Sequence, residues 1–206
     1  MARPDYEAAA SRLEKAVALF ERCDEEYLAS TLRVIFGATL LLQGEGERAE
    51  RTFEAALASA RRLKVPSLNY IALYNSAQSA LVRGDLEKAA RMLEEGIEWS
   101  KQTKDRANLV YFLEALAAVE AFGGEAERCA LLLGAAEALL EEVGARVYNY
   151  YVPDPSLRER AVAEARAALG EAAFEEAWAH GREMSFEQAV LYALRVDATR
   201  GDSVTR

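Results

Sequence analysis

The sequence predicts an all-α fold, a solenoid of helical hairpins that repeat every 40 residues and end in three capping helices. Composition is the first observation behind this prediction: 51% of the 206 residues are hydrophobic, and only 12 Gly and 4 Pro interrupt the chain. Ala, Leu, Glu and Arg, which are strong helix formers, supply much of the sequence. The second observation is a pattern that occurs three times in one register. A period of this size is typical of stacked helical pairs.

The repeated pattern begins at a glycine and continues into an amphipathic helix. Its three copies are GEGERAERTFEAAL at 44–57, GDLEKAARMLEEGI at 84–97 and GEAERCALLLGAAE at 124–137. Small residues align at Ala49, Ala89 and Cys129, and also at Gly37, Ala77 and Ala117 in the preceding helices; large residues align at Phe53, Leu93 and Leu133. We predict that the large residues are core residues, and that neighbouring helices approach closely at the small ones.

The elements follow in order. An N-terminal helix over 5–22 fits the second half of a repeat, so it is either a cap or part of a longer array. Repeats near 24–63, 66–103 and 106–143 complete the first region, residues 1–145.

Residues 146–196 are predicted to form three capping helices, and residues 197–206 a flexible tail. Two sequences of the capping-box type, Ser156–Glu159 and Ser185–Gln188, are expected to open helices in this region.

Charge and hydropathy limit the classes of function. The net charge is −9 and the basic residues are scattered, so we expect no direct binding to nucleic acid. No signal peptide and no segment long enough to span a membrane is evident, which predicts a soluble, cytoplasmic protein without a membrane partner. Cys23 and Cys129 are predicted to be reduced and to lie in or near the core.

The spacing small–Gly–Ala–large–small resembles the tetratricopeptide repeat, whose usual period is 34 residues. The resemblance implies a right-handed α–α solenoid in which the first helix of each pair lines a concave groove. It assigns groove positions by their distance from the small residues at 37, 77 and 117. The partner-binding residues that follow are Thr31, Val34, Ile71, Tyr74, Gln78, Tyr111 and Glu114.

The C-terminal part resembles the tetratricopeptide-like region of large bacterial signal-transduction ATPases, including LuxR-type and MalT-like transcription regulators. The segments LLLGAAEALLEEVGA (131–145) and ARAALGEAAFEEAWAHGREMSFEQAVLYAL (165–194) carry this resemblance, which is close over roughly 110–196 and loose upstream. In that family the region senses an inducer or a partner protein. No phosphate-binding loop motif occurs in this sequence, so only the sensor or scaffold role carries over.

The inventory of reactive groups does not predict an enzyme. His180 is the only histidine and lies at the end of a predicted helix, and no Cys/His spacing suits a metal. We therefore assign no catalytic, cofactor-binding or metal-binding residue. Tyr148, Tyr150 and Tyr151 are expected to pack a connecting loop onto the core, with a pocket lining as the alternative.

These observations predict a non-catalytic scaffold that serves as the sensor or interaction module of a bacterial transcription or signalling regulator. Its partner would be a protein or peptide, in particular an amphipathic helix, or an apolar small ligand. Three alternatives stay open. They are a free-standing adaptor unrelated to transcription, a helical enzyme, and a homodimer formed through the N-terminal end.

Overall fold

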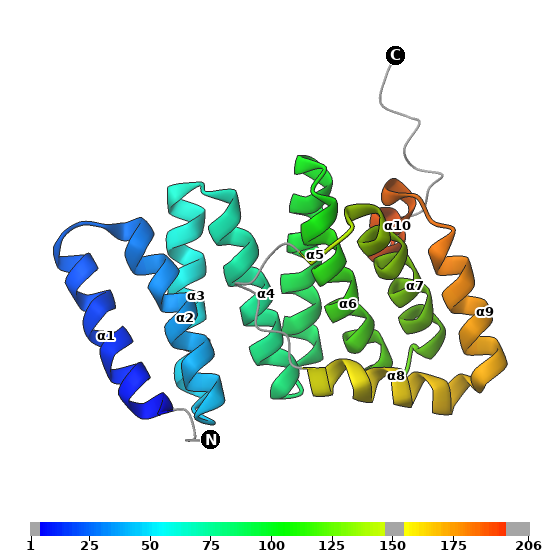
Figure 1. The fold of residues 1–206 in the computed structure, drawn as a ribbon, viewed down its shortest axis with the longest axis horizontal. Helices are drawn as coiled ribbons and strands as arrows, with labels where there is room; N and C mark the ends of the chain where they lie inside the picture. Colours follow the sequence, from blue (N-terminus) through cyan, green and yellow to red (C-terminus); the bar gives the residue numbers. More distant parts are fainter. Residues whose placement is uncertain (1–4, 147–154, 197–206) are drawn as a thin grey trace, which may run out of the picture. The chain divides into compact units, whose positions relative to one another are not determined.

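The computed structural model describes residues 5–146 and 155–196, which form ten α-helices and no strand (Figure 1). The predicted all-α class is therefore confirmed for this part of the chain. The helices are α1 (Tyr6–Arg22), α2 (Glu26–Leu42), α3 (Gly46–Leu63), α4 (Pro66–Val82), α5 (Leu86–Thr103), α6 (Arg106–Phe122), α7 (Ala126–Val143), α8 (Pro155–Leu169), α9 (Glu171–Arg182) and α10 (Phe186–Ala193).

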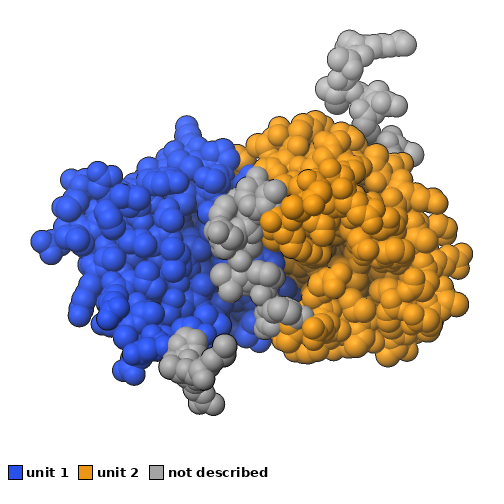
Figure 2. All heavy atoms as spheres, in the orientation of Figure 1, with its two compact units in different colours: residues 1–85, 150–152 blue, residues 86–149, 153–206 orange. Residues whose placement is uncertain are grey.

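The chain divides into two compact units, shown in different colours in Figure 2. Unit 1 contains α1–α4 and unit 2 contains α5–α10. This division falls after Asp85, whereas the sequence placed a boundary between repeats and capping helices at 145/146. Tyr148, Tyr150, Tyr151 and the predicted tail at 197–206 lie outside the described residues.

In unit 1, each helix packs on the next one along the chain, and α2 also contacts α4. Phe53 is fully buried at the centre of this packing. A Cβ atom at Gly37 would lie 2.6 Å from Cε1 of the Phe53 ring, so α2 and α3 approach closely only because residue 37 has no side chain. The small residue predicted at this position therefore has a steric cause.

Unit 2 contains an equally close contact between α5 and α6. A Cβ atom at Gly96 would lie 2.0 Å from Cε1 of Phe112, and Phe112 is fully buried. The predicted core residues Leu93 and Leu133 are also buried. The large positions of the repeated pattern therefore lie inside the protein, as predicted.

Helix ends follow local chemistry. Gly44, Gly84 and Gly124 have φ values of +81°, +76° and +87°, a left-handed conformation that glycine adopts without the steric cost of a Cβ atom. Pro66 begins α4, where its missing N–H would have had no helical partner.

The predicted capping box at Ser185 is present. Ser185 accepts a hydrogen bond from the Gln188 amide, and the Gln188 side chain accepts one from the Ser185 amide, so both halves of the box are formed. A helix also opens at the other predicted position, since α8 begins at Pro155, next to Ser156. The capping hydrogen bonds of Ser156 and Glu159 stay a prediction.

The last three helices pack on unit 2. Helix α8 contacts α6 and α7, α9 contacts α7 and α8, and α10 contacts α5, α6 and α7. Arg128 of α7 fixes α10 by donating hydrogen bonds to the carbonyl oxygens of Tyr192 (2.9 Å) and Ala193 (2.7 Å). Its charge is balanced by Glu120, whose Oε1 lies 2.7 Å from Arg128 Nε. Arg128 thereby gives hydrogen-bond donors to two carbonyl oxygens in the last turn of α10, where helical N–H donors run out.

The two cysteines are both free but differ in environment. Cys129 is fully buried, as predicted, and this burial raises the pKa of its thiol to about 12. The prediction that Cys23 lies in or near the core is wrong, because Cys23 ends α1 and is exposed. Its position just past the last turn of the helix places it outside the buried face.

This difference predicts selective alkylation. At pH 8 iodoacetamide should modify Cys23 rapidly, and Cys129 only after the protein is unfolded, because the thiolate is the reactive form. Mass spectrometry of the native and the urea-unfolded chain measures the extent of alkylation at each of the two cysteines. Equal labelling of both thiols in the native protein would contradict the burial of Cys129.

Candidate functional site

The most distinctive surface of unit 1 is an apolar stripe along α2. Leu28, Ile35 and Leu42 expose 40%, 49% and 56% of their surface. They are seven residues apart, which is close to two helical turns, so they share one side of the helix. We call these three residues the α2 face.

The α2 face carries no charge. Helix α2 contains only two charged residues, Glu26 in its first turn and Arg33. Arg33 is engaged elsewhere, since it forms an ion pair with Glu21 and donates a hydrogen bond to Ser59 Oγ at 3.2 Å. Water therefore meets a row of aliphatic side chains along almost the whole helix, which is unusual for an outer helix of a domain.

On α4 and α6, most residues at the positions that correspond to the α2 face are buried. At intervals of 40 residues, Leu28 corresponds to Leu68 and Asn108, and Ile35 corresponds to Asn75 and Ala115; all four of these residues are buried. Leu42 corresponds to Val82, which is exposed like Leu42. The residues that correspond to Leu28 and Ile35 are thus buried in packing on α4 and α6, whereas on α2 no described helix covers Leu28 and Ile35.

The predicted groove residues of unit 1 lie mostly inside it. Val34, Ile71, Tyr74 and Gln78 are buried, and only Thr31 is partly accessible. Thr31 borders the α2 face, and its hydroxyl donates a hydrogen bond to the Tyr27 carbonyl oxygen, 3.0 Å away. The four buried side chains offer no surface to a partner in this structure, so binding at these positions stays a prediction.

In unit 2 the structure brings the two remaining predicted residues together through an arginine. Arg146 donates hydrogen bonds of 2.9 and 2.5 Å to the two carboxylate oxygens of Glu114. Its guanidinium also lies 5.5 Å from the centroid of the Tyr111 ring. Tyr111 is buried and Glu114 is partly accessible. Both residues take part in a contact that anchors the chain after α7.

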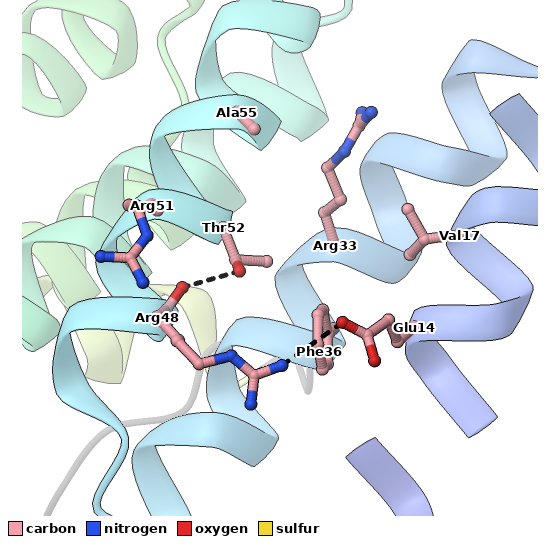
Figure 3. A pocket seen from close by; sticks show the side chains of 8 residues that line it. All are labelled: Glu14, Val17, Arg33, Phe36, Arg48, Arg51, Thr52 and Ala55. Atoms are coloured by element: carbon pink, nitrogen blue, oxygen red, sulfur yellow. Dashed lines mark hydrogen bonds and ion pairs between the residues drawn. The ribbon is translucent and has the colours of Figure 1, made fainter. Parts of the chain in front are cut away.

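A cavity of about 260 Å³ opens between α1, α2 and α3 of unit 1 (Figure 3). It is lined by Glu14, Val17, Arg33, Phe36, Arg48, Arg51, Thr52 and Ala55. Figure 3 shows Glu14 and Arg48 reaching toward each other next to Phe36. The Arg48 guanidinium carbon lies 5.8 Å from the centroid of the Phe36 ring. Arg33 directs its guanidinium away from Arg48.

The charges of this cavity are already paired. Arg48 Nη1 lies 2.6 Å from Glu45 Oε2, and Arg48 Nη2 lies 3.3 Å from Glu14 Oε1. The hydrogen bond to Glu45 raises the pKa of Arg48 further above its usual value, so the guanidinium keeps its charge. Arg51 is 3.9 Å from Glu47. A ligand anion would have to compete with these carboxylates, so the cavity is a weaker candidate site than the α2 face.

The described residues include no group of three or more His, Cys, Asp or Glu side chains arranged to hold a metal ion. His180, the only histidine, is exposed in the last turn of α9. Within the same ranges, no helix combines the length and the apolar character needed to cross a lipid bilayer.

Comparisons of the chain with protein-family models, with curated proteins and with solved structures gave no match.

The α2 face was missed by sequence reasoning. The groove positions came from the tetratricopeptide resemblance; of the two on α2, Thr31 borders the α2 face and Val34 is buried, and Leu28, Ile35 and Leu42 were not among them. One signal was available, namely apolar residues seven apart at 28, 35 and 42 in a helix with only two charges.

Proposed function

We propose that this chain is a non-catalytic scaffold of tetratricopeptide-like hairpins whose α2 face binds an amphipathic helix. The observation that carries this proposal is the exposed, uncharged stripe of Leu28, Ile35 and Leu42. Burying such a stripe removes apolar surface from water at about 25 cal/mol per Å². A second helix with apolar residues at the same spacing is the element that fits along it.

The helix boundaries support the repeat part of the proposal. Helices α2, α4 and α6 begin at Glu26, Pro66 and Arg106, and α3, α5 and α7 begin at Gly46, Leu86 and Ala126. Both series advance by 40 residues. We propose that these pairs belong to one right-handed solenoid and that α8–α10 cap its C-terminal end. Stacked repeats of this kind commonly present extended binding surfaces.

The biological role we favour is that of the sensor or interaction module of a bacterial transcription or signalling regulator, located in the cytoplasm. The support for this role is the resemblance of the C-terminal segments to that region of such regulators. A free-standing adaptor would use the same surface. The proposed helix-binding activity does not depend on which of the two is correct.

Binding of a designed helix tests this function. The probe is a fluorescent synthetic peptide with leucine every seven residues on one face, alternating lysine and glutamate elsewhere, and no net charge. Ile35→Glu should weaken its binding at least about tenfold, because a carboxylate would be buried in the centre of the apolar contact. Fluorescence anisotropy measures the dissociation constants.

Val82→Glu is the matched control. Val82 exposes 55% of its surface on α4 of the same unit, so this variant adds the same charge outside the α2 face. Its affinity for the peptide should equal that of the wild type. An unchanged affinity in Ile35→Glu, an equal loss in both variants, or no binding by the wild type would each contradict the proposed site.

A further inference from the structure

We propose that the cavity between α1, α2 and α3 binds a small carboxylate with an apolar body, and that the ligand's carboxylate takes the place of Glu14 beside Arg48. The three residues of the α2 face lie outside the described lining of this cavity. The new site is therefore separate from the surface that the proposed function uses, and either can exist without the other.

The lining of the cavity has an excess of positive charge. Among the described residues that line it, three are arginines and one is a carboxylate, namely Arg33, Arg48, Arg51 and Glu14. The whole chain, in contrast, carries a net charge of −9. A cavity lined mainly by charges of one sign concentrates small ions of the opposite sign. An anion is therefore the class of ligand that this lining favours.

Arg48 already binds a carboxylate at the position proposed for the ligand. Its Nη1 lies 2.6 Å from Glu45 Oε2, three residues earlier in the chain, and its Nη2 lies 3.3 Å from Glu14 Oε1 on α1. The short contact with Glu45 holds the guanidinium in place. Glu14 exposes 63% of its side chain, and an exposed ion pair contributes little to stability. A ligand carboxylate can therefore displace Glu14 into water and bind Arg48 Nη2 while Glu45 stays.

Arg51 supplies a second positive charge. Its Nη1 is 3.9 Å from Glu47 Oε2, beyond hydrogen-bond distance, and Glu47 exposes 88% of its side chain. Arg51 lies three residues after Arg48, so the two side chains share one side of α3, where their like charges repel. An anion beside both relieves this repulsion. Arg33 is engaged elsewhere, since it pairs with Glu21 and turns its guanidinium away from Arg48 (Figure 3).

The remaining lining suits an apolar body. Val17 of α1 and Phe36 of α2 are buried residues of the lining, and Ala55 of α3 joins them. The volume of about 260 Å³ is smaller than that of pockets for drug-sized molecules, which begin at about 300 Å³. A molecule with one ring and one carboxylate, such as phenylacetate, therefore combines the two properties that the lining selects.

Titration of the full chain with sodium phenylacetate, followed by nuclear magnetic resonance of the backbone amides, tests the site. We expect saturable shifts of amide signals in α1, α2 and α3. Phenylethanol has the ring without the charge, and acetate has the charge without the ring. Each should bind at least about tenfold more weakly than phenylacetate, because each loses one of the two contacts.

Substitutions separate the contributions of the charges. Arg48→Gln and Arg51→Gln should each weaken phenylacetate binding at least about tenfold, because each removes a charge-assisted contact. Glu14→Gln should tighten binding about threefold, because it removes the competing carboxylate and keeps the size of the side chain. Arg61→Gln is the matched control for the arginines, since Arg61 is exposed on α3 outside the described lining. Its affinity should equal that of the wild type, and circular dichroism checks the helix content of every variant.

Four results would overturn the inference. They are a wild type without saturable binding, arginine variants that bind as well as Arg61→Gln, a Glu14→Gln variant that binds no more tightly than the wild type, and phenylethanol or acetate binding as tightly as phenylacetate. The last result would show an apolar cavity or an adventitious ion only. Ile35→Glu should leave phenylacetate binding unchanged while it weakens binding of the designed peptide, so failure here is distinguishable from failure of the proposed function.

Discussion

Replacement of Phe53 by alanine is expected to lower the free energy of unfolding by about 3–5 kcal/mol, the usual range for a buried Phe→Ala change. The ring is fully buried, and it fills the space that Gly37 leaves between α2 and α3. Helix α3 packs on both α2 and α4, so we expect the packing not to collapse fully into the cavity. Urea unfolding followed by circular dichroism gives the change in free energy from the midpoint and slope.

Leu19→Ala serves as the control for this prediction. Leu19 exposes half of its surface on α1, so its truncation should change the stability by less than about 0.5 kcal/mol. A loss in Phe53→Ala as small as that of the control would show that residue 53 is not a core position. The register of the repeated pattern would then be wrong.

The second large effect is expected in unit 2, where α7 and α9 touch backbone to backbone. A Cβ atom at Gly134 would lie 2.0 Å from the Trp178 carbonyl oxygen and 3.0 Å from the Arg182 amide nitrogen. A Cβ atom at Gly181 would lie 2.1 Å from the Leu131 carbonyl oxygen. Backbone atoms cannot rotate away as a side chain can, so any added atom must push the helices apart.

Gly134→Ala should therefore destabilise the protein by about 3 kcal/mol, at the upper end of the range for overpacking. Gly46→Ala is the matched control, because a Cβ atom there would meet its nearest neighbour, Arg83 Cδ, at an ordinary 3.7 Å. Its stability should stay constant or rise slightly. Thermal unfolding of both variants measures the difference, and equal melting temperatures would contradict the close packing of α7 on α9.

Much of the fold could be predicted from the sequence, because the helix signals were local and repeated. Glycine turns at 44, 84 and 124, Pro66 at a helix start and the Ser185 capping box each act within a few residues. Phe53 was identifiable as core because the same position holds a large residue in all three copies. Helix boundaries followed directly from such signals.

The exposed side of α2 could not be predicted in the same way. Its apolar residues surround the helix, with Val34 and Phe36 buried and Ile35 between them exposed. Periodicity identifies a buried face only when a polar face opposes it. On α2 the choice depends on which neighbours are present, and this is a property of the tertiary structure.

Tyr74 and Gln78 illustrate the same limit from the other direction. The resemblance placed them in an open groove, whereas α4 is buried on all sides from Leu68 to Leu81. A helix with little amphipathic character gives no sequence signal for such burial. Polar side chains on α4, including Asn75, also suggested an exposed surface although they are buried.

Disulfide trapping of the designed peptide at Ile35 tests the central claim most directly, namely that the α2 face binds an amphipathic helix. Ile35→Cys is made together with Cys23→Ser, which removes the exposed native thiol, and the peptide carries one cysteine in place of its central leucine. A peptide helix that lies on the α2 face can bring the two cysteines to the Cα separation of about 4.4–6.8 Å that a disulfide requires. Under mild oxidation we expect a covalent adduct of protein and peptide that reductant reverses, while Val82→Cys in the same background forms none. An Ile35→Cys variant that forms no adduct, or equal cross-linking at both positions, would contradict the claim.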